Sequence, residues 1–146
     1  MPFANYVDAF ALDRTDGLPA IVWCMDFLEG GRPFGRALMQ LAWRGPLGLR
    51  LGSLADPTLV AGWQVSIADE HLFAVRASSW MLAASLIFEA QRGRAVVTTA
   101  VTYNRVIARL VWGAGLSAVH RAVMPRALGG TRTRINDRQR APRRTQ

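Results

Sequence analysis

The segment that most constrains the fold runs from Trp63 to Leu128, where four short runs typical of β-strands precede one long run with helical spacing. In the first run, residues 63–67, large apolar side chains alternate with polar ones, as in a half-buried β-strand. Alternating runs over residues 71–77 and 96–103 predict two more strands, and the run over residues 81–89, apolar on both faces, predicts a central strand between them that is covered twice. A curved antiparallel sheet followed by one long helix buries its apolar faces by enclosing a pocket or an interface. We therefore expect a binding cavity between the sheet and the helix.

The helix predicted after Asn104 carries two apolar stripes, which lie side by side around its axis. The bulky stripe consists of Trp112, Leu116, Val119 and Val123. The small stripe consists of Ala108, Val111, Gly115, Ala118 and Ala122. Such a helix can press on a sheet along the bulky stripe and stand off along the small one, which leaves a cavity. The alternative is that the small stripe receives another helix. Pro125 is expected to end or kink this helix.

The N-terminal part of the chain predicts one strand and two short helices. Residues 5–12 fit a first strand or an extended lead-in, and residues 18–28 and 33–43 both show helical spacing. Gly30 and Gly31 form a flexible joint between the two helices, and Pro33 suits a first helical turn. Residues 45–57 form an irregular connection to the strands.

Composition indicates one globular domain with a basic tail. The chain has 146 residues, a net charge of +8 and 18 basic residues, every one an arginine. Residues 130–146 hold six of these arginines against one acidic residue. We expect residues 1–129 to form a single domain and residues 130–146 to be a disordered Arg-rich tail. Such a tail could bind nucleic acid or an anionic membrane, but it has no aromatic residue for base stacking. A solvated tail without a partner is favoured.

The chain offers few residues for a disulfide, a membrane span or a metal site. Cys24 is the single cysteine, and the first residues do not resemble a signal peptide. The longest apolar stretch, residues 106–124, is interrupted by charged residues, so no transmembrane helix is expected. One cysteine and two histidines without ligand spacing predict no metal, and we expect no cofactor. The cytoplasm is the expected location. No established catalytic motif is present.

Several short motifs, taken in order, carry a resemblance to a known superfamily. They are Tyr6-Val7-Asp8-Ala9-Phe10, Arg36-Ala37-Leu38-Met39, Gly48-Leu49-Arg50, Val97-Thr98-Thr99-Ala100-Val101, Asn104-Arg105 and His120-Arg121. Over residues 4–128 the chain resembles the SRPBCC superfamily, which includes START-like lipid-transfer domains and aromatase/cyclase-like proteins. It is most similar to an uncharacterised actinobacterial family of that superfamily, a domain of unknown function.

The resemblance implies an α+β helix-grip fold. In this fold a curved antiparallel sheet wraps around a long C-terminal helix, with two short helices after the first strand. It also implies a cavity for a small hydrophobic or amphipathic ligand, such as a lipid, an isoprenoid or a polyketide-like compound. Two alternatives stay open: a cyclase- or dehydratase-like enzyme on the same fold, and an interaction protein that uses its basic tail. The sequence favours binding over catalysis and leaves a homo-oligomer open.

The sequence periodicity and the resemblance together indicate candidate site residues. The expected ligand contacts are Trp63, Phe73, Trp80, Leu86, Tyr103, Val111, Gly115 and Ala118. The candidate polar rim consists of His71, Arg76, His120 and Arg121. At a rim, an imidazole beside a guanidinium could hold a carboxylate or act as acid or base. The helical periodicity instead favours a solvent-facing His120, and the place of His71 after a turn favours an ordinary strand end.

Overall fold

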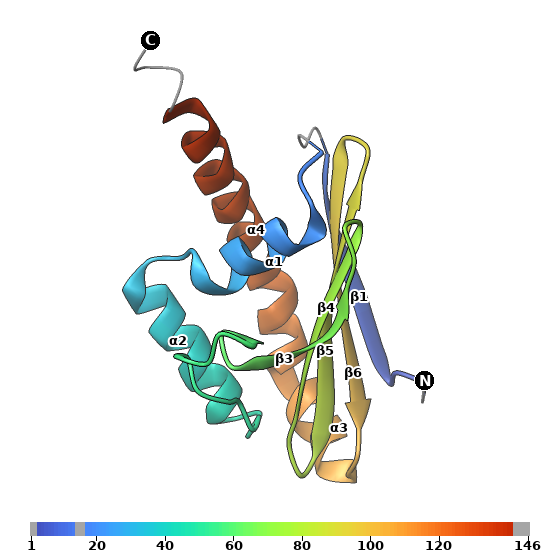
Figure 1. Ribbon diagram of the computed structural model, residues 1–146. Helices are drawn as coiled ribbons and strands as arrows, with labels where there is room; N and C mark the ends of the chain where they lie inside the picture. Colours follow the sequence, from blue (N-terminus) through green and yellow to red (C-terminus); the bar gives the residue numbers. More distant parts are fainter. Residues whose placement is uncertain (1–2, 14–16, 142–146) are drawn as a thin grey trace.

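The computed structural model describes residues 3–13 and 17–141. It contains one sheet with the strand order β1-β6-β5-β4-β3-β2, in which every neighbouring pair is antiparallel (Figure 1). The strands are β1 (Tyr6–Asp13), β2 (Leu59–Val60), β3 (Trp63–Ala68), β4 (Leu72–Ser78), β5 (Leu82–Gln91) and β6 (Arg94–Tyr103). The helices are α1 (Ala20–Glu29), α2 (Pro33–Arg44), α3 (Val106–Val111), the π-helical segment η1 (Trp112–Leu116) and α4 (Ser117–Arg140).

This arrangement is the α+β helix-grip fold, and it confirms the fold class predicted from the sequence. The sheet is covered on one face by α1 and by the long C-terminal segment, while α2 stands further out (Figure 1). The four strands predicted between residues 63 and 103 correspond to β3, β4, β5 and β6, and the predicted first strand corresponds to β1. A short strand, β2, which the sequence did not predict, pairs with β3 at the edge.

The strand alternation decides which side chains face the helices. In β5 the residues Leu82, Ala84, Leu86 and Phe88 are buried, and the residues between them are only half-buried. Across the sheet, Leu86 stands opposite Thr99, and Thr99 stands opposite Asp8. This covered face is therefore apolar over most of its area, with one polar row in β6 and β1.

Helix α1 packs tightly on this face, whereas α2 does not. Ala20 and Cys24 of α1 are fully buried, and Phe27 meets Phe88 edge-to-face with ring centroids 5.7 Å apart. Burial raises the pKa of the Cys24 thiol well above its usual range, so this thiol stays protonated. Helix α2 has no buried residue. The core thus lies between the sheet, α1 and α4.

The C-terminal helix is interrupted at Ala114 and Gly115 and not at Pro125. Gly115 has a φ of 136°, a region that side chains other than glycine rarely adopt, and Ala114 is also non-helical. Helix α4 continues past Pro125 to Arg140, so the predicted end there is wrong. Pro125 has no backbone N–H, so the carbonyl group of Arg121 lacks its usual partner within the helix. Both residues are exposed, so water can solvate this carbonyl group.

The structure also differs from the expectation of a disordered tail beginning at residue 130. Helix α4 continues to Arg140, with Thr131 and Ile135 buried. The side chain of Asp26 on α1 is fully buried and is bound by two tail arginines. Arg134 Nε donates to Asp26 Oδ2 at 2.9 Å, and Arg138 also donates to this carboxylate. These contacts order the segment, and residues 142–146 of the expected tail lie outside the described residues.

We predict that Gly115→Ala destabilises the protein by about 1–2 kcal/mol, because the new Cβ is strained at a φ of 136°. The matched control is Gly113→Ala, where a Cβ meets nothing within 4 Å and no positive φ occurs. This second change is expected to be neutral or stabilising by up to about 1 kcal/mol. Chemical denaturation of both variants measures the difference. Equal stability of the two variants would contradict the break at Gly115.

We further predict that Arg134→Met lowers the free energy of unfolding by about 1–3 kcal/mol, because a buried carboxylate loses a charged hydrogen-bond donor. The control is Arg132→Met, which removes the same charge from the same helix without touching Asp26. Hydrogen exchange at the amides of residues 130–140 should accelerate in the first variant alone. Equal exchange in both variants would show that the arginine does not order this segment.

Candidate ligand cavity

A cavity of about 380 Å³ lies between the sheet, α2 and the segment η1–α4. Its wall consists of Phe27, Leu38, Met39, Ala42, Trp43, Leu47, Leu49, Trp63, Leu82, Ala84, Leu86, Thr99, Val101, Trp112, Leu116, Val119, His120, Val123, Met124 and Ala127. Apart from Thr99 and His120, every lining residue is apolar. The site is thus an apolar chamber with one polar spot.

The cavity opens between α2 and α4. On α4, Val119 and Val123 line the cavity and are nevertheless 57% and 48% exposed, and Leu38 of α2 is 56% exposed. Helix α2 is held by a few polar contacts, among them the bond from Gln40 Nε2 to the carbonyl oxygen of Ala61 at 3.0 Å. Trp43 also meets Trp63 edge-to-face at 5.3 Å. The mouth is therefore bordered by apolar side chains on both helices.

The bulky stripe of the C-terminal helix faces the cavity, which corrects the expectation that the small stripe does. Trp112, Leu116, Val119 and Val123 all line the wall. From the small stripe, Ala118 and Ala122 are exposed, whereas Ala108 is completely buried. The small stripe is divided at the break at Gly115, with Ala108 buried before it and Ala118 exposed after it, whereas the bulky stripe lines the cavity on both sides of the break.

The polar spot is a cluster of four side chains, Tyr6, Asp8, Thr99 and His120. His120 Nε2 lies 3.1 Å from Thr99 Oγ1 and 3.3 Å from Asp8 Oδ2. The Tyr6 hydroxyl donates to Asp8 Oδ2 at 2.6 Å. The side chains of His120 and Asp8 are only 17% and 13% exposed. The expectation that His120 faces solvent is therefore wrong. Its imidazole contacts the carboxylate of Asp8, which lies at an inward position of β1 and cannot be recognised from the helical periodicity alone.

Burial sets the protonation of this cluster. It lowers the pKa of His120, an effect that the nearby Asp8 carboxylate partly opposes. Burial and the hydrogen bond to Asp8 raise the pKa of Tyr6 to about 12, so its hydroxyl remains a donor at neutral pH. A neutral imidazole both donates and accepts hydrogen bonds. The cluster can accordingly orient a polar group of a ligand or exchange a proton with it.

Aromatic rings surround this cluster. Trp112 lies edge-on to Tyr6, with ring centroids 5.3 Å apart, and its ring centroid is 5.5 Å from that of the His120 imidazole. The indole N–H groups of Trp63 and Trp112 are buried without an acceptor among the described residues. The apolar rings shield the contacts of His120 with Asp8 and Thr99 from water, which strengthens them.

Of the predicted ligand contacts, Trp63 and Leu86 line the cavity. Phe73 is buried on the same sheet face but stands opposite Phe88, beneath α1, and so lies outside the wall. Trp80 is 58% exposed in the turn between β4 and β5. Tyr103, Val111 and Gly115 are half-buried outside the wall, and Ala118 is exposed.

Of the predicted rim residues, only His120 reaches the cavity. His71 lies at the turn before β4, and Arg76 and Arg121 are exposed on the surface. Tyr6, Asp8 and Thr99 were not predicted as site residues. A signal for them existed, because Tyr6, Asp8 and Phe10 alternate in β1 and place a carboxylate on the apolar face.

The described residues were also compared with the requirements for a metal site and for a membrane-spanning helix. Among the residues that the structure describes, no group of three or more His, Cys, Asp or Glu side chains could hold a metal ion. In the same part of the chain, no helix combines the length and the apolar character needed to cross a membrane.

Comparisons with known proteins give two similar structures. A polyketide-cyclase-like protein from Corynebacterium glutamicum has 10% sequence identity and a TM-score of 0.42, with 93% of this chain and 94% of that chain covered. An uncharacterised protein from Rhizobium leguminosarum has 16% identity and a TM-score of 0.37, with 88% and 96% covered. No protein-family model and no curated protein matches. Because both TM-scores are below 0.5, the fold assignment rests on the topology of this chain itself.

We predict that acid destabilises the protein partly through His120. Since its pKa is lower in the folded state, the unfolded chain binds more protons below about pH 6.5, and stability falls as the pH falls through that value. His120→Gln should therefore show a smaller drop in Tm between about pH 7.5 and pH 5.5 than the unchanged protein. The control is His71→Gln at the exposed second histidine. If both variants lose the same Tm on acidification, His120 is not the responsible group.

Proposed function

We propose that the cavity binds a small hydrophobic or amphipathic molecule, such as a lipid, an isoprenoid or a polyketide-like compound. The observation that carries this proposal is the composition of the wall, in which apolar side chains surround a space of about 380 Å³. This volume falls within the roughly 300–1,000 Å³ that small-molecule sites commonly have. The polar spot, which reaches the cavity wall through Thr99 and His120, matches a ligand with one polar end.

Affinity in this proposal comes from apolar burial, at roughly 25 cal/mol for each Å² removed from water. Orientation comes from His120, which is held by Asp8 and Thr99 and presents a neutral ring at the wall. A carbonyl, hydroxyl or carboxyl group of the ligand would lie at this ring, with its apolar part directed toward Trp63 and Leu86. The mouth between α2 and α4 provides the way in.

We also propose that the chain is a member of the SRPBCC superfamily and of its uncharacterised actinobacterial family. Support comes from the order of elements, in which one strand and two helices precede an antiparallel meander and a long C-terminal helix. The location of the cavity between sheet and helix agrees with what this resemblance implies.

A second candidate function is acid–base catalysis of the cyclase or dehydratase type. The observation that favours it is the pairing of His120 with Asp8 beside the cavity, since a carboxylate fixes the orientation of an imidazole that moves a proton. Arg121, which the sequence analysis grouped with His120, is exposed and lies outside the wall. Catalysis would therefore depend on His120, Asp8 and Tyr6.

Native mass spectrometry of the purified protein tests the binding function. We expect a copurifying small molecule that organic solvent extracts, and binding of a fluorescent fatty-acid analogue as a defined probe. Val123→Trp should lower probe affinity about tenfold, because overfilling an apolar site costs about 1–3 kcal/mol. The control is Val7→Trp, at a similarly exposed valine on the opposite face of the sheet.

Two further outcomes separate the candidates. Equal probe affinity in the two tryptophan variants, together with no copurifying molecule, would end the binding proposal. Conversion of the extracted molecule on incubation with fresh protein, abolished in His120→Gln while binding persists, would establish catalysis. An unchanged molecule in both proteins would support binding alone.

A further inference from the structure

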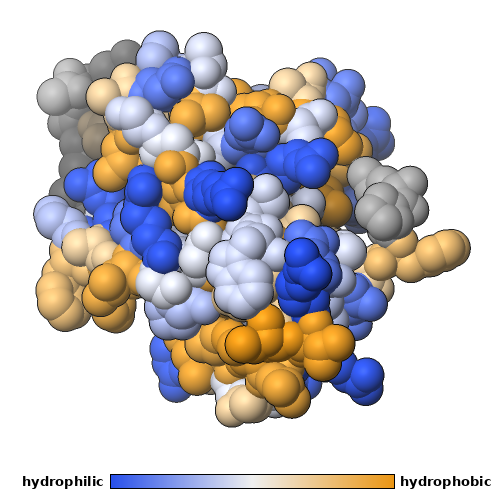
Figure 2. Space-filling view, turned by 90° about the horizontal axis from the view of Figure 1, so that it is seen from below, coloured by the Kyte–Doolittle hydropathy of each residue, from blue (hydrophilic) through white to orange (hydrophobic). Residues whose placement is uncertain are grey.

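One end of the molecule exposes several large apolar side chains. Val106, Ile107 and Leu110 of α3 are 80%, 44% and 64% exposed, and Trp80 in the turn between β4 and β5 is 58% exposed. The two segments are adjacent, because the carbonyl oxygen of Met81 accepts hydrogen bonds from the backbone N–H groups of residues 104 and 105. Figure 2, which views the molecule from this end, shows hydrophobic residues gathered next to hydrophilic ones.

Arginines accompany these apolar side chains. Arg105 and Arg109 belong to the same helical segment and are exposed. Arg50 is also exposed, and its backbone N–H donates to the carbonyl oxygen of Ser78 at the end of β4. We call this surface the α3 end and define it by Arg50, Trp80, Arg105, Val106, Ile107, Arg109 and Leu110.

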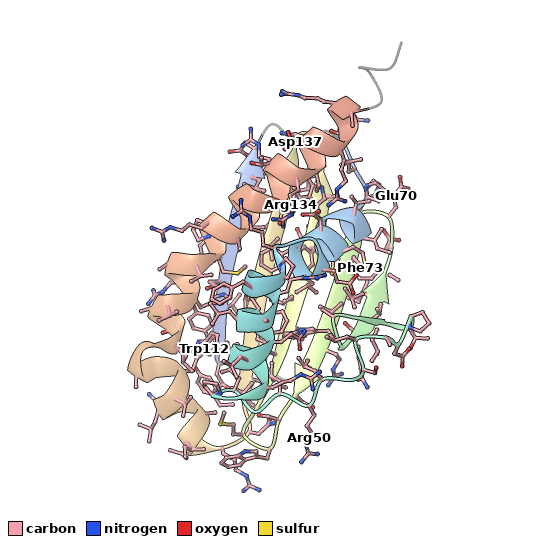
Figure 3. All side chains as sticks on the ribbon, turned by 90° about the vertical axis from the view of Figure 1, so that its left-hand side faces the viewer. Arg50, Glu70, Phe73, Trp112, Arg134 and Asp137 are labelled. Atoms are coloured by element: carbon pink, nitrogen blue, oxygen red, sulfur yellow. The ribbon has the colours of Figure 1, made fainter. Side chains whose placement is uncertain are left out.

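Acidic residues lie at the other end of the sheet. The register of the strands places Asp13, Asp69, Glu70 and Glu89 at the end opposite to Ser78, Leu82 and Tyr103. Figure 3 shows Glu70 and Asp137 at one end of the molecule and Arg50 at the other. The chain has no acidic residue at positions 30–55, 71–88 or 90–136, which include every segment of the α3 end. The α3 end therefore has arginines without an acidic residue, whereas the opposite end carries both acidic residues and arginines such as Arg92 and Arg94.

We propose that the α3 end docks on the surface of an anionic lipid bilayer. Exposed apolar residues flanked by arginines match the two layers of such a surface: the apolar side chains enter the boundary of the acyl chains, and the arginines meet lipid phosphates. Tryptophan also favours this boundary, and Trp80 provides one. Helix α3, with six residues, is too short to do more than lie on the membrane.

A second copy of the chain fits this surface less well. In a symmetric dimer the same patch meets itself, so Arg50, Arg105 and Arg109 would face their own copies without a nearby acidic partner. A bilayer that contains anionic lipid instead supplies the opposite charge. The α3 end is also continuous with the cavity wall, because η1 follows α3 directly and its residues Trp112 and Leu116 line the cavity. Docking does not depend on what the cavity binds.

Flotation of the full chain with lipid vesicles tests this proposal. Vesicles of equal parts phosphatidylcholine and phosphatidylglycerol should carry the protein, whereas vesicles of phosphatidylcholine alone should not. Binding should fall in about 1 M salt, where the Debye length shrinks to about 3 Å. Arg105→Gln with Arg109→Gln should weaken binding about tenfold or more, since each arginine near an anionic surface contributes several-fold. Val106→Asp with Leu110→Asp should abolish binding.

Matched controls locate the contact. Arg92→Gln with Arg140→Gln removes two arginines at the opposite end, and Phe34→Asp with Leu41→Asp changes two exposed apolar residues of α2. Both control proteins should float like the unchanged protein. Absence of flotation, or an equal loss in control and test variants, would overturn the proposal. A concentration-dependent dimer in sedimentation that Leu110→Asp abolishes would assign the surface to a second copy instead.

Discussion

The fully buried carboxylate of Asp26 determines how the C-terminal helix crosses the molecule. A buried charge is tolerated only when it is paired, and its partners Arg134 and Arg138 lie on α4, more than 100 residues further along the chain. The contact holds the last turns of α4 against α1 (Figure 3). Because α1 itself packs on the sheet through Phe27, the helix end is held away from the sheet by the thickness of α1. The space beneath α4 follows from this separation.

A second contact holds α4 where it begins. His120 reaches down to Asp8 and Thr99 on the sheet, only a few residues after the break at Gly115. The break lets α3 and η1 pack Ala108 and Trp112 against the core, while α4 leaves at its own angle toward α1. One wall of the cavity is thus α4, which is held at one end by His120 and at the other by Arg134. His120 also belongs to the polar spot in the wall of the cavity.

Sequence periodicity was sufficient for the strands and insufficient for the faces of the last helix. The alternation in β4 and β6 reflects a sheet with one apolar face, so the fold class followed from it. The helical stripes assumed one continuous period of 3.6, but Gly115 interrupts the helix, and the small stripe is divided into a buried Ala108 and an exposed Ala118 instead of facing the cavity. The arginines after residue 130 looked solvated because their partner, Asp26, lies in a distant helix. His120 was misplaced for the same reason: its partner Asp8 is 112 residues away.

The walls of the cavity differ in how firmly they are held, and this difference bears on function. The sheet, α1 and α4 share one core, whereas α2 buries none of its residues and leaves Phe34, Leu38 and Leu41 exposed. A helix that gains so little from apolar burial is the element that moves at the lowest cost in free energy. Leu38 lies at the mouth, so a bound molecule would cover apolar surface that the protein alone leaves in water. Entry and closure would then depend on α2, while His120 on the firmly held side fixes the orientation of the ligand.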